Sequence, residues 1–288
     1  MTMSAWMKTG LALGCGVAAT AVAAMMARRR WDRATADLLL RVEGAPERAV
    51  VPVEPPATST SSSSLDALPA PVARYFAFAL TAGGTLVRRA RIEQEGELAT
   101  SPGAWKPFTA TQHVSVSPPG FVWDARVRMM PLVAAYVRDG YVDGAGTMRG
   151  ALAGVVPLVD QGGTRAMAVA SLQRYLAEAP WTPPALLPSA GVRWEAIDDT
   201  TARATLVDRG VTASVDFHFG ARDEIVGTTA ERPRDVHGTP LLTPWVGRFG
   251  DYVRIDGMMV PREGEVAWVL PDGAQPYWRG RVTRARYE

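Results

Sequence analysis

The chain has 288 residues, 47% of them hydrophobic and 21% charged, which is ample for a substantial folded core. Its formal net charge of +2 is set by basic residues near the N-terminus, and beyond residue 33 the two signs are mixed. The absence of a basic stripe argues against nucleic acid as a partner. The single cysteine, Cys15, excludes an internal disulfide.

An uncharged run over residues 9–27 lies between Lys8 and the Arg28–Arg30 cluster. As a helix it would be about as long as the hydrocarbon core of a bilayer is thick, about 30 Å. Residues 1–30 are therefore predicted to form a single-pass membrane anchor, with the membrane as a partner. The arginines after the run favour a cytoplasmic C-terminal side. The alternative is an exported protein, either anchored by this segment or secreted after cleavage.

Residues 31–64 are predicted to connect this anchor to a folded domain. Trp31–Val42 has the composition of a short juxtamembrane helix with an interfacial tryptophan. Residues 44–64 end in a Ser/Thr/Pro-rich stretch that cannot bury enough apolar surface to order itself. The expected role of this linker is spacing.

The remainder, residues 65–288, is predicted to form one mainly β domain. Apolar residues recur at helical spacing over 65–79, and a second helix is expected at Gly163–Glu178. Elsewhere apolar and polar residues alternate, most regularly in Phe121–Met129, which is typical of half-buried strands. The predicted strands cover residues 86–98, 105–116, 121–129, 133–142, 147–155, 192–197, 202–207, 211–219, 224–231, 243–252, 260–270 and 277–282.

Roughly a dozen strands without a βαβ rhythm predict a large antiparallel sheet. A sheet of that length must curl, so the expected architecture is an open or partly closed barrel with one or two packing helices.

Several stretches of this domain carry a resemblance to a known family. They are Trp105–Phe108, Pro118–Met129, Tyr141–Gly146, Arg174–Glu178, Trp194–Asp198, Thr243–Tyr252 and Tyr277–Val282. In these the chain resembles an uncharacterised bacterial domain-of-unknown-function family over residues 65–288. The resemblance implies no activity and no catalytic residues. The order of elements is also similar to the periplasmic lipoprotein-carrier half-barrel, whose concave face takes up acyl chains.

Catalytic candidates are few. The chain lacks a Gly-x-Ser-x-Gly elbow, a phosphate-binding glycine loop and a His-Glu-x-x-His motif. Asp216 and His218 share one strand face and could act as a general-base pair, or as metal ligands if His113 joined them. The alternative is a polar row on the solvent side of the strand. The sequence predicts no cofactor and leans towards a protein that is not an enzyme.

Charged residues also recur at strand spacing, including Glu95 and Glu97 on one predicted strand and Arg279 and Arg281 on another. Two interpretations remain open. Cross-strand Arg–Glu ladders on a solvated face would explain the pattern. If the rows faced inward instead, they would form a polar lumen or a site for an anionic headgroup.

Large aromatic residues would fill the curve of such a sheet or line an apolar pocket, and arginines would bind a carboxylate or phosphate at its mouth. The candidate ligand-binding residues are Trp123, Arg126, Arg128, Tyr136, Trp181, Trp245, Arg248, Tyr252, Trp278 and Arg279. The leading hypothesis is a membrane-tethered β domain that binds an apolar or amphipathic, lipid-like ligand without catalysis. The alternatives are a hydrolase or metal-dependent enzyme using His218 and Asp216, and a structural or protein-interaction module with a packed sheet.

Overall fold

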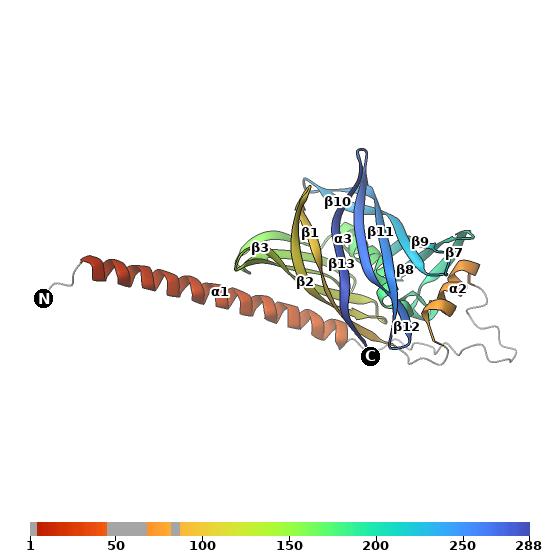
Figure 1. The fold of residues 1–288 in the computed structure, drawn as a ribbon, viewed down its shortest axis with the longest axis horizontal. Helices are drawn as coiled ribbons and strands as arrows, with labels where there is room; N and C mark the ends of the chain where they lie inside the picture. Colours follow the sequence, from red (N-terminus) through yellow and green to blue (C-terminus); the bar gives the residue numbers. More distant parts are fainter. Residues whose placement is uncertain (1–4, 45–67, 82–86) are drawn as a thin grey trace.

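The computed structural model of the chain describes residues 5–44, 68–81 and 87–288, with side chains from residue 22 onward. The predicted linker at 44–64 lies outside these residues except for Gly44. One antiparallel sheet dominates the described part (Figure 1). Its first six strands are β1 Arg89–Ser101, β2 Ala104–Ser115, β3 Gly120–Met130, β4 Val133–Val142, β5 Ala145–Leu152 and β6 Val156–Gly162. The other seven are β7 Arg193–Asp198, β8 Thr201–Asp208, β9 Val211–Phe219, β10 Ile225–Val236, β11 Thr239–Ile255, β12 Met258–Leu270 and β13 Gly273–Tyr287.

The 13-stranded sheet consists of two meanders joined through the first and last strands. Its order is β6-β5-β4-β3-β2-β1-β13-β12-β11-β10-β9-β8-β7, so β1 pairs with β13 although they lie at opposite ends of the domain. The end strands β6 and β7 do not pair with each other, and the sheet therefore stays open. The predicted mainly β, curled antiparallel architecture is confirmed.

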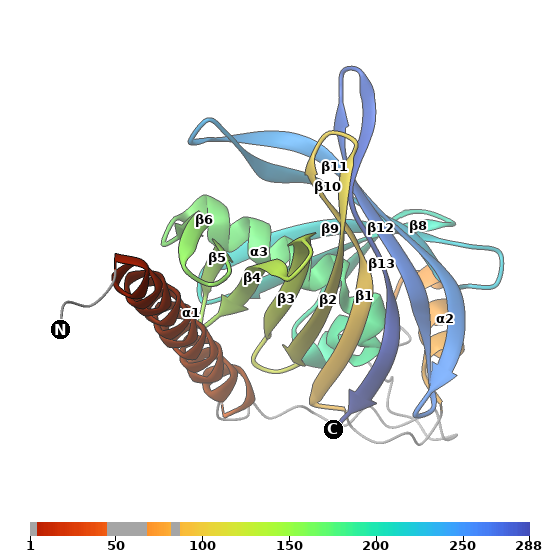
Figure 2. The same ribbon diagram turned by 60° about the vertical axis from the view of Figure 1, so that its left-hand side comes forward.

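The chain between the two edge strands fills the curve of the sheet. Helix α3, Arg165–Ala177, contacts β4 and β5 on one side and β9 and β10 on the other. The side chain of Thr164 caps its first turn by accepting a hydrogen bond from the Met167 amide at 3.1 Å. Three short 3₁₀ turns follow, at Ala179–Trp181, Pro183–Leu186 and Pro188–Ala190. We call the sheet face against α3 the inner face (Figure 2).

The remaining helices pack around this sheet. Helix α2, Ala70–Ala79, contacts β8 and β12 and buries Val72, Tyr75 and Phe76. Helix α1, Ala5–Glu43, runs without a break through residue 30 and contacts β2, β3 and β4 on the opposite, outer face. Within the described ranges, no helix is long and apolar enough to span a bilayer. From Ala5 onward the predicted anchor is helical, but it does not meet the requirements of a transmembrane span.

The C-terminal half of α1 is docked on the β domain. Trp31 is 9% exposed, and its Nε1 donates to Asp124 Oδ1 at 3.1 Å. The guanidinium of Arg138 lies 4.7 Å from the centre of the Trp31 ring and donates to the Trp31 carbonyl and to Thr35 Oγ1. At the end of the helix, Glu43 Oε1 lies 2.7 Å from His113 Nδ1. The predicted juxtamembrane helix is thus the second half of α1, seated on the sheet.

Most predicted strands are present, with some differences. The strand predicted at 147–155 ends at Leu152, because Ala153 and Gly154 adopt positive φ and turn the chain into β6. Edge strand β6 was missed because it shows no regular burial alternation and contains Pro157. The last three strands also extend further than predicted, most clearly β11.

Candidate binding groove

The charged rows found in the sequence form cross-strand ladders on the outer face. Glu97 pairs in register with Arg279, and its Oε2 accepts from Arg279 Nη2 at 2.6 Å. Glu95 lies opposite Arg281, and its Oε1 is 3.5 Å from Arg281 Nε. All four side chains are about half exposed, so each pair contributes only about 0–1 kcal/mol to stability. Since the rows face away from α3, the predicted ladder is correct and the inward-facing lumen is not formed.

The same face is hollowed into a groove of about 1110 Å³. Its floor crosses β1, β13, β12 and β11, and its end is formed by the β3–β4 hairpin. The lining residues are Glu95, Gly96, Glu97, Pro107, Phe108, Thr109, Arg126, Arg128, Met130, Leu132, Val133, Ala134, Arg248, Phe249, Gly250, Glu263, Gly264, Glu265, Arg279, Gly280 and Arg281. The groove is therefore amphipathic, with a charged floor and apolar residues at the β3–β4 hairpin.

A row of glycines lets the strands bend beneath the groove. Gly96 pairs with Gly280, and Gly280 pairs with Gly264, across β1, β13 and β12. A Cβ atom on Gly96 would overlap the carbonyl oxygen of Arg279, and one on Gly264 would lie 3.0 Å from the Trp181 ring. Any larger side chain in this row would separate the strands or displace the aromatic rings below.

Arg128 is the groove-lining cation nearest to the apolar β3–β4 hairpin. It pairs in register with Ala134 and is exposed. Among the residues that the structure describes, no carboxylate lies within ion-pair distance of Arg128. Arg248 is only loosely paired, with Nη1 3.7 Å from Glu265 Oε1. These two guanidinium groups have hydrogen-bonding capacity to offer an incoming anion.

Arg126 lines the groove where it meets α1. Its Nη1 donates to Asp124 Oδ1 at 2.7 Å, and its guanidinium lies 4.0 Å from the centre of the Tyr136 ring. Nη2 of Arg126 also lies 3.7 Å from Oδ1 of Asp32 in α1. Arg126 is therefore held in place by the helix and the sheet, and Tyr136 supports it from below. Tyr136 also packs edge-to-face against Trp31, at 5.9 Å between ring centres.

The other aromatic candidates lie on the inner face. Trp123, Trp181 and Trp278 are each at most 8% exposed. With Phe108 and Phe249 they form a continuous series of ring contacts, each 5.6 to 5.9 Å between centres. These rings fill the curve of the sheet beneath the glycine row, as the packed-core interpretation predicts.

Trp245 and Tyr252 have partners inside the protein. Trp245 Nε1 donates to the Tyr277 hydroxyl at 2.9 Å, and Arg232 lies 4.7 Å from the centre of the Trp245 indole. The Tyr252 hydroxyl donates to the Ile225 carbonyl at 2.8 Å. Burial, with the nearby charge of Glu224, raises the pKa of Tyr252, so its hydroxyl remains protonated.

The ten candidate ligand-binding residues therefore divide into two groups. Arg126, Arg128, Arg248 and Arg279 line the groove, and the six aromatic residues lie outside its lining.

The histidine and aspartate candidates do not converge. Asp216 accepts two hydrogen bonds from Arg203, at 2.6 and 2.9 Å. His218 lies between Thr201 and Thr229, with Nε2 3.0 Å from Thr229 Oγ1. His113 is on β2, separated from β9 by β1, β13, β12, β11 and β10. Within the described residues, no group of three or more His, Cys, Asp or Glu side chains could hold a metal ion.

The apolar end of the groove was not among the sequence-based candidates. Met130 ends β3 and Leu132 lies in the β3–β4 turn, and they are 56% and 106% exposed. A signal was present in the sequence, because Met130-Pro131-Leu132-Val133 places apolar residues where a hairpin turn ordinarily carries polar ones or glycine.

The fold and the groove define the class of protein: a single curled, open antiparallel sheet with a helix in its curve and an amphipathic groove on the outer face. Residues 66–287 match the family of unknown function DUF6920. The match covers most of the chain, so the protein belongs to this family, as its sequence predicted. Comparison with curated proteins finds no match.

Two solved structures are similar in outline. The crystal structure of a LolA superfamily protein from Nitrosomonas europaea is 13% identical, covering 77% of this chain and 94% of that one at a TM-score of 0.40. A beta-barrel-like protein of the domain of unknown function DUF1849 from Brucella abortus is 8% identical, covering 70% of this chain and 98% of that one at a TM-score of 0.27.

Proposed function

We propose that the protein binds an anionic amphiphile in the outer-face groove, as a membrane-tethered domain without catalysis. The observation that carries this proposal is the position of Arg128, an exposed guanidinium group beside the apolar Met130–Ala134 hairpin that has no carboxylate partner among the described residues. Arg128 would donate paired hydrogen bonds to a carboxylate or phosphate. The apolar hairpin would shield the hydrocarbon part of the ligand from water. Each Å² of apolar surface buried in this way contributes about 25 cal/mol to the binding free energy.

The chemistry of the lining supports binding over covalent catalysis. The described residues that line the groove include no serine, cysteine or histidine, and Thr109 supplies their one hydroxyl. Asp216 and His218, the candidates for the enzyme alternative, lie outside the groove and are engaged by Arg203 and two threonines. A merely packed module would not need an open groove next to an exposed arginine.

The ligand proposal is tested with the full-length protein in phosphatidylcholine nanodiscs. A fluorescent fatty acid is titrated into the wild type and the Arg128→Gln and Arg284→Gln variants. Arg284 is an exposed arginine of β13 outside the groove lining and serves as the matched control. Loss of one charged hydrogen-bonding group costs about 1.5–3 kcal/mol, so Arg128→Gln should weaken binding by about 10- to 100-fold.

Equal affinity for the wild type and Arg128→Gln would contradict the proposed site. Failure of the wild type to bind any anionic amphiphile would contradict the function itself. His218→Ala should bind as the wild type does, because His218 lies outside the groove.

The tether remains part of the proposal. Residues 9–27 are uncharged, and the Arg28–Arg30 cluster favours a cytoplasmic β domain. Alkaline carbonate extraction should leave the full-length protein in the membrane pellet, and its release into the supernatant would contradict an anchor. A reporter fused after Glu288 distinguishes a cytoplasmic β domain from an exported one.

A further inference from the structure

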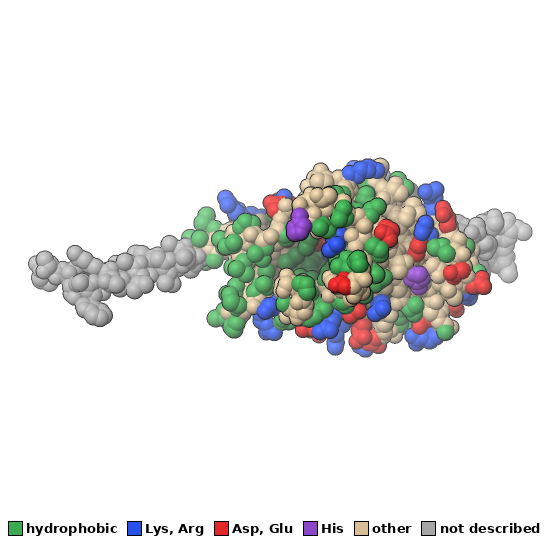
Figure 3. Space-filling model, turned by 90° about the horizontal axis from the view of Figure 1, so that it is seen from above, with side chains coloured by type: hydrophobic (Ala, Val, Ile, Leu, Met, Phe, Trp, Pro, Cys, Tyr) green, Lys and Arg blue, Asp and Glu red, His purple; other side chains and the backbone are tan. Residues whose placement is uncertain are grey.

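Exposed apolar side chains gather at one end of the molecule, which we call the apolar end. It consists of Val22, Met25, Met26, Met130, Leu132, Val155, Val156 and Leu158, each at least 49% exposed. Figure 3 shows hydrophobic side chains collected where α1 projects from the body, and α1 contacts β3. Three separate segments therefore contribute to one apolar surface.

The hydrogen-bond register holds these segments together. The Ala153 amide donates to the Ala134 carbonyl at 2.8 Å, which joins the β5–β6 turn to the β3–β4 hairpin. The β5–β6 turn also reaches α1, because a Cβ atom on Gly154 would lie 3.8 Å from the Arg28 amide nitrogen. The β5–β6 turn thus links the β3–β4 hairpin to α1 near Arg28.

Leu132 adopts a conformation that a leucine does not favour. Its φ is 65°, in the left-handed region, and its side chain is 106% exposed. Glycine or asparagine is the usual residue at the second central position of such a turn after proline. Leucine costs free energy there, and among the described residues its side chain gains no burial that would offset this cost. The strain therefore points to an apolar environment outside the chain.

Basic residues border the apolar end on α1. Arg28, Arg29, Arg30 and Arg33 are all exposed and follow directly after the uncharged run over 9–27. An apolar surface with a cluster of arginines at its edge matches an anionic lipid bilayer, where apolar side chains enter the acyl boundary and arginines contact the headgroups.

We infer that the apolar end is a bilayer-contact surface, in which the β3–β4 and β5–β6 tips enter the lipid headgroup region alongside α1. Lipid contact at this surface holds the β3–β4 hairpin, and with it one end of the groove, against the membrane. It does not depend on ligand binding in the groove, because Val155, Val156 and Leu158 lie outside the groove lining.

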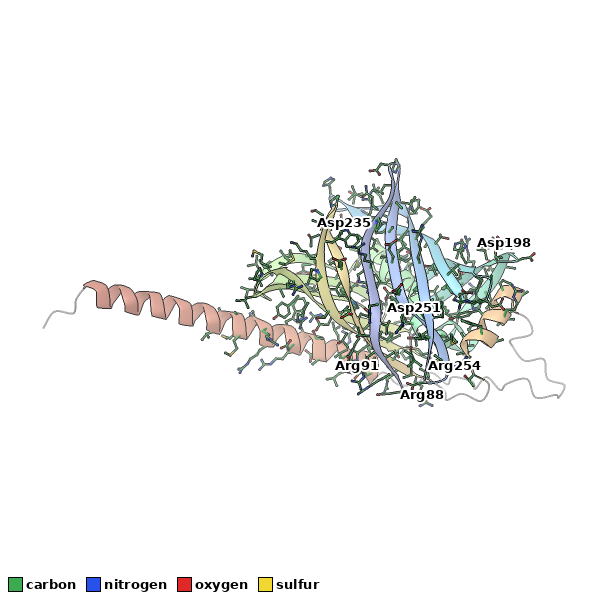
Figure 4. All side chains as sticks on the ribbon, in the orientation of Figure 1. Arg88, Arg91, Asp198, Asp235, Asp251 and Arg254 are labelled. Atoms are coloured by element: carbon green, nitrogen blue, oxygen red, sulfur yellow. The ribbon has the colours of Figure 1, made fainter. Side chains whose placement is uncertain are left out.

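Depth-dependent fluorescence quenching tests this inference in the full-length protein. With Cys15→Ser as background, Leu132→Cys, Val156→Cys and Ile197→Cys are each labelled with NBD and reconstituted into phosphatidylglycerol/phosphatidylcholine vesicles. Ile197 is 50% exposed and lies beside Asp198, at the opposite end of the molecule from α1 (Figure 4). Nitroxide-labelled lipids should quench the labels at 132 and 156 and blue-shift their emission, with no effect at 197.

Two results would overturn the inference. Quenching of the 132 and 156 labels by aqueous iodide, but not by the lipid nitroxide, would place the tips in water. Shielding of both labels from iodide and from the nitroxide would mean that a protein, or a second copy of this chain, covers the apolar end. Neither readout requires a ligand in the groove, so a failed binding titration and a failed quenching experiment remain distinguishable.

A second variant separates lipid contact from folding. Leu132→Asn places a residue tolerant of the left-handed region at the turn. Its free energy of unfolding should equal or exceed that of the wild type, while lipid quenching of the label at 156 decreases. A destabilised variant with unchanged quenching at 156 would show that Leu132 serves the fold, and would overturn the inference.

Discussion

The guanidinium group of Arg174 donates from Nη1 to Asp139 Oδ2, which joins α3 to the inner face of β4. Nε of Arg174 donates to Glu178 at 2.8 Å, and Gln112 donates to the other oxygen of Glu178 at 2.7 Å. Burial by itself would lower the pKa of Arg174, but the two carboxylates outweigh it and raise that pKa. The helix in the curve of the sheet is therefore held by a charged cluster within an apolar core.

Arg174→Met should strongly destabilise the fold. The substitution leaves the mostly buried carboxylates of Asp139 and Glu178 without their counter-charge, which costs about 3–5 kcal/mol. Urea unfolding followed by tryptophan fluorescence measures the change. Arg262→Met is the control. Arg262 forms an exposed ion pair at 2.6 Å with Asp251, which Figure 4 labels, and its loss should cost at most about 1 kcal/mol. Equal losses in the two variants would contradict a buried cluster.

Gly96→Ala should disrupt the bend beneath the groove. The new methyl group would overlap the Arg279 carbonyl on the neighbouring strand, so a cost of about 3 kcal/mol or more is expected. Gly250→Ala is the matched control, because no atom of the described residues lies within 4 Å of its Cβ position. Gly250 also has no positive φ, so alanine there should be neutral or stabilise by up to about 1 kcal/mol. Thermal unfolding of both variants distinguishes the sites, and similar melting temperatures would refute the close approach.

Glu224 should make stability depend on pH. Burial would raise the pKa of this carboxyl, but hydrogen bonds from backbone amides and from the Arg222 side chain lower it. Its stabilising contribution is therefore complete above the unfolded-state pKa, near 4.5, and is lost as pH falls through the lower folded-state pKa.

Glu224→Gln should accordingly destabilise the protein at pH 7 by about 1–2 kcal/mol and by progressively less as pH falls towards 3. Urea unfolding at a series of pH values measures this difference. Glu231→Gln, at an exposed carboxylate of β10, should change stability by less than about 0.5 kcal/mol throughout. A constant Glu224→Gln difference from pH 7 to 3 would rule out the charged carboxylate as its source.

Trp31→Ala should release the second half of α1 from the sheet. It removes the hydrogen bond to Asp124, the ring contact with Tyr136 and the stacking of Arg138. The expected loss of stability is about 3 kcal/mol or more. Hydrogen exchange should accelerate in α1 while β3 keeps its protection. Leu40→Ala, at a side chain 70% exposed, should leave both unchanged. Unaltered exchange in α1 of Trp31→Ala would mean that the docking depends on other contacts.

Much of the secondary structure follows from local chemistry. Strand β3 spans Gly120–Met130 against a prediction of 121–129, because strict alternation of apolar and charged residues reports a two-faced strand. Helix α3 spans Arg165–Ala177 against a prediction of 163–178, since Thr164 and Pro180 mark its ends. Edge strand β6 was not recognised because both of its faces are largely exposed and carry no periodic signal.

The sequence by itself determined the fold class, the family and the two-faced strands. Only the tertiary structure decided which face of the sheet is buried, because alternation with a period of two separates the faces without saying which one meets α3. It also brought Arg128, Arg248 and Arg279 to one groove and kept His113 away from His218. These relationships depend on the pairing of β1 with β13, a contact between strands at opposite ends of the domain that no local pattern encodes.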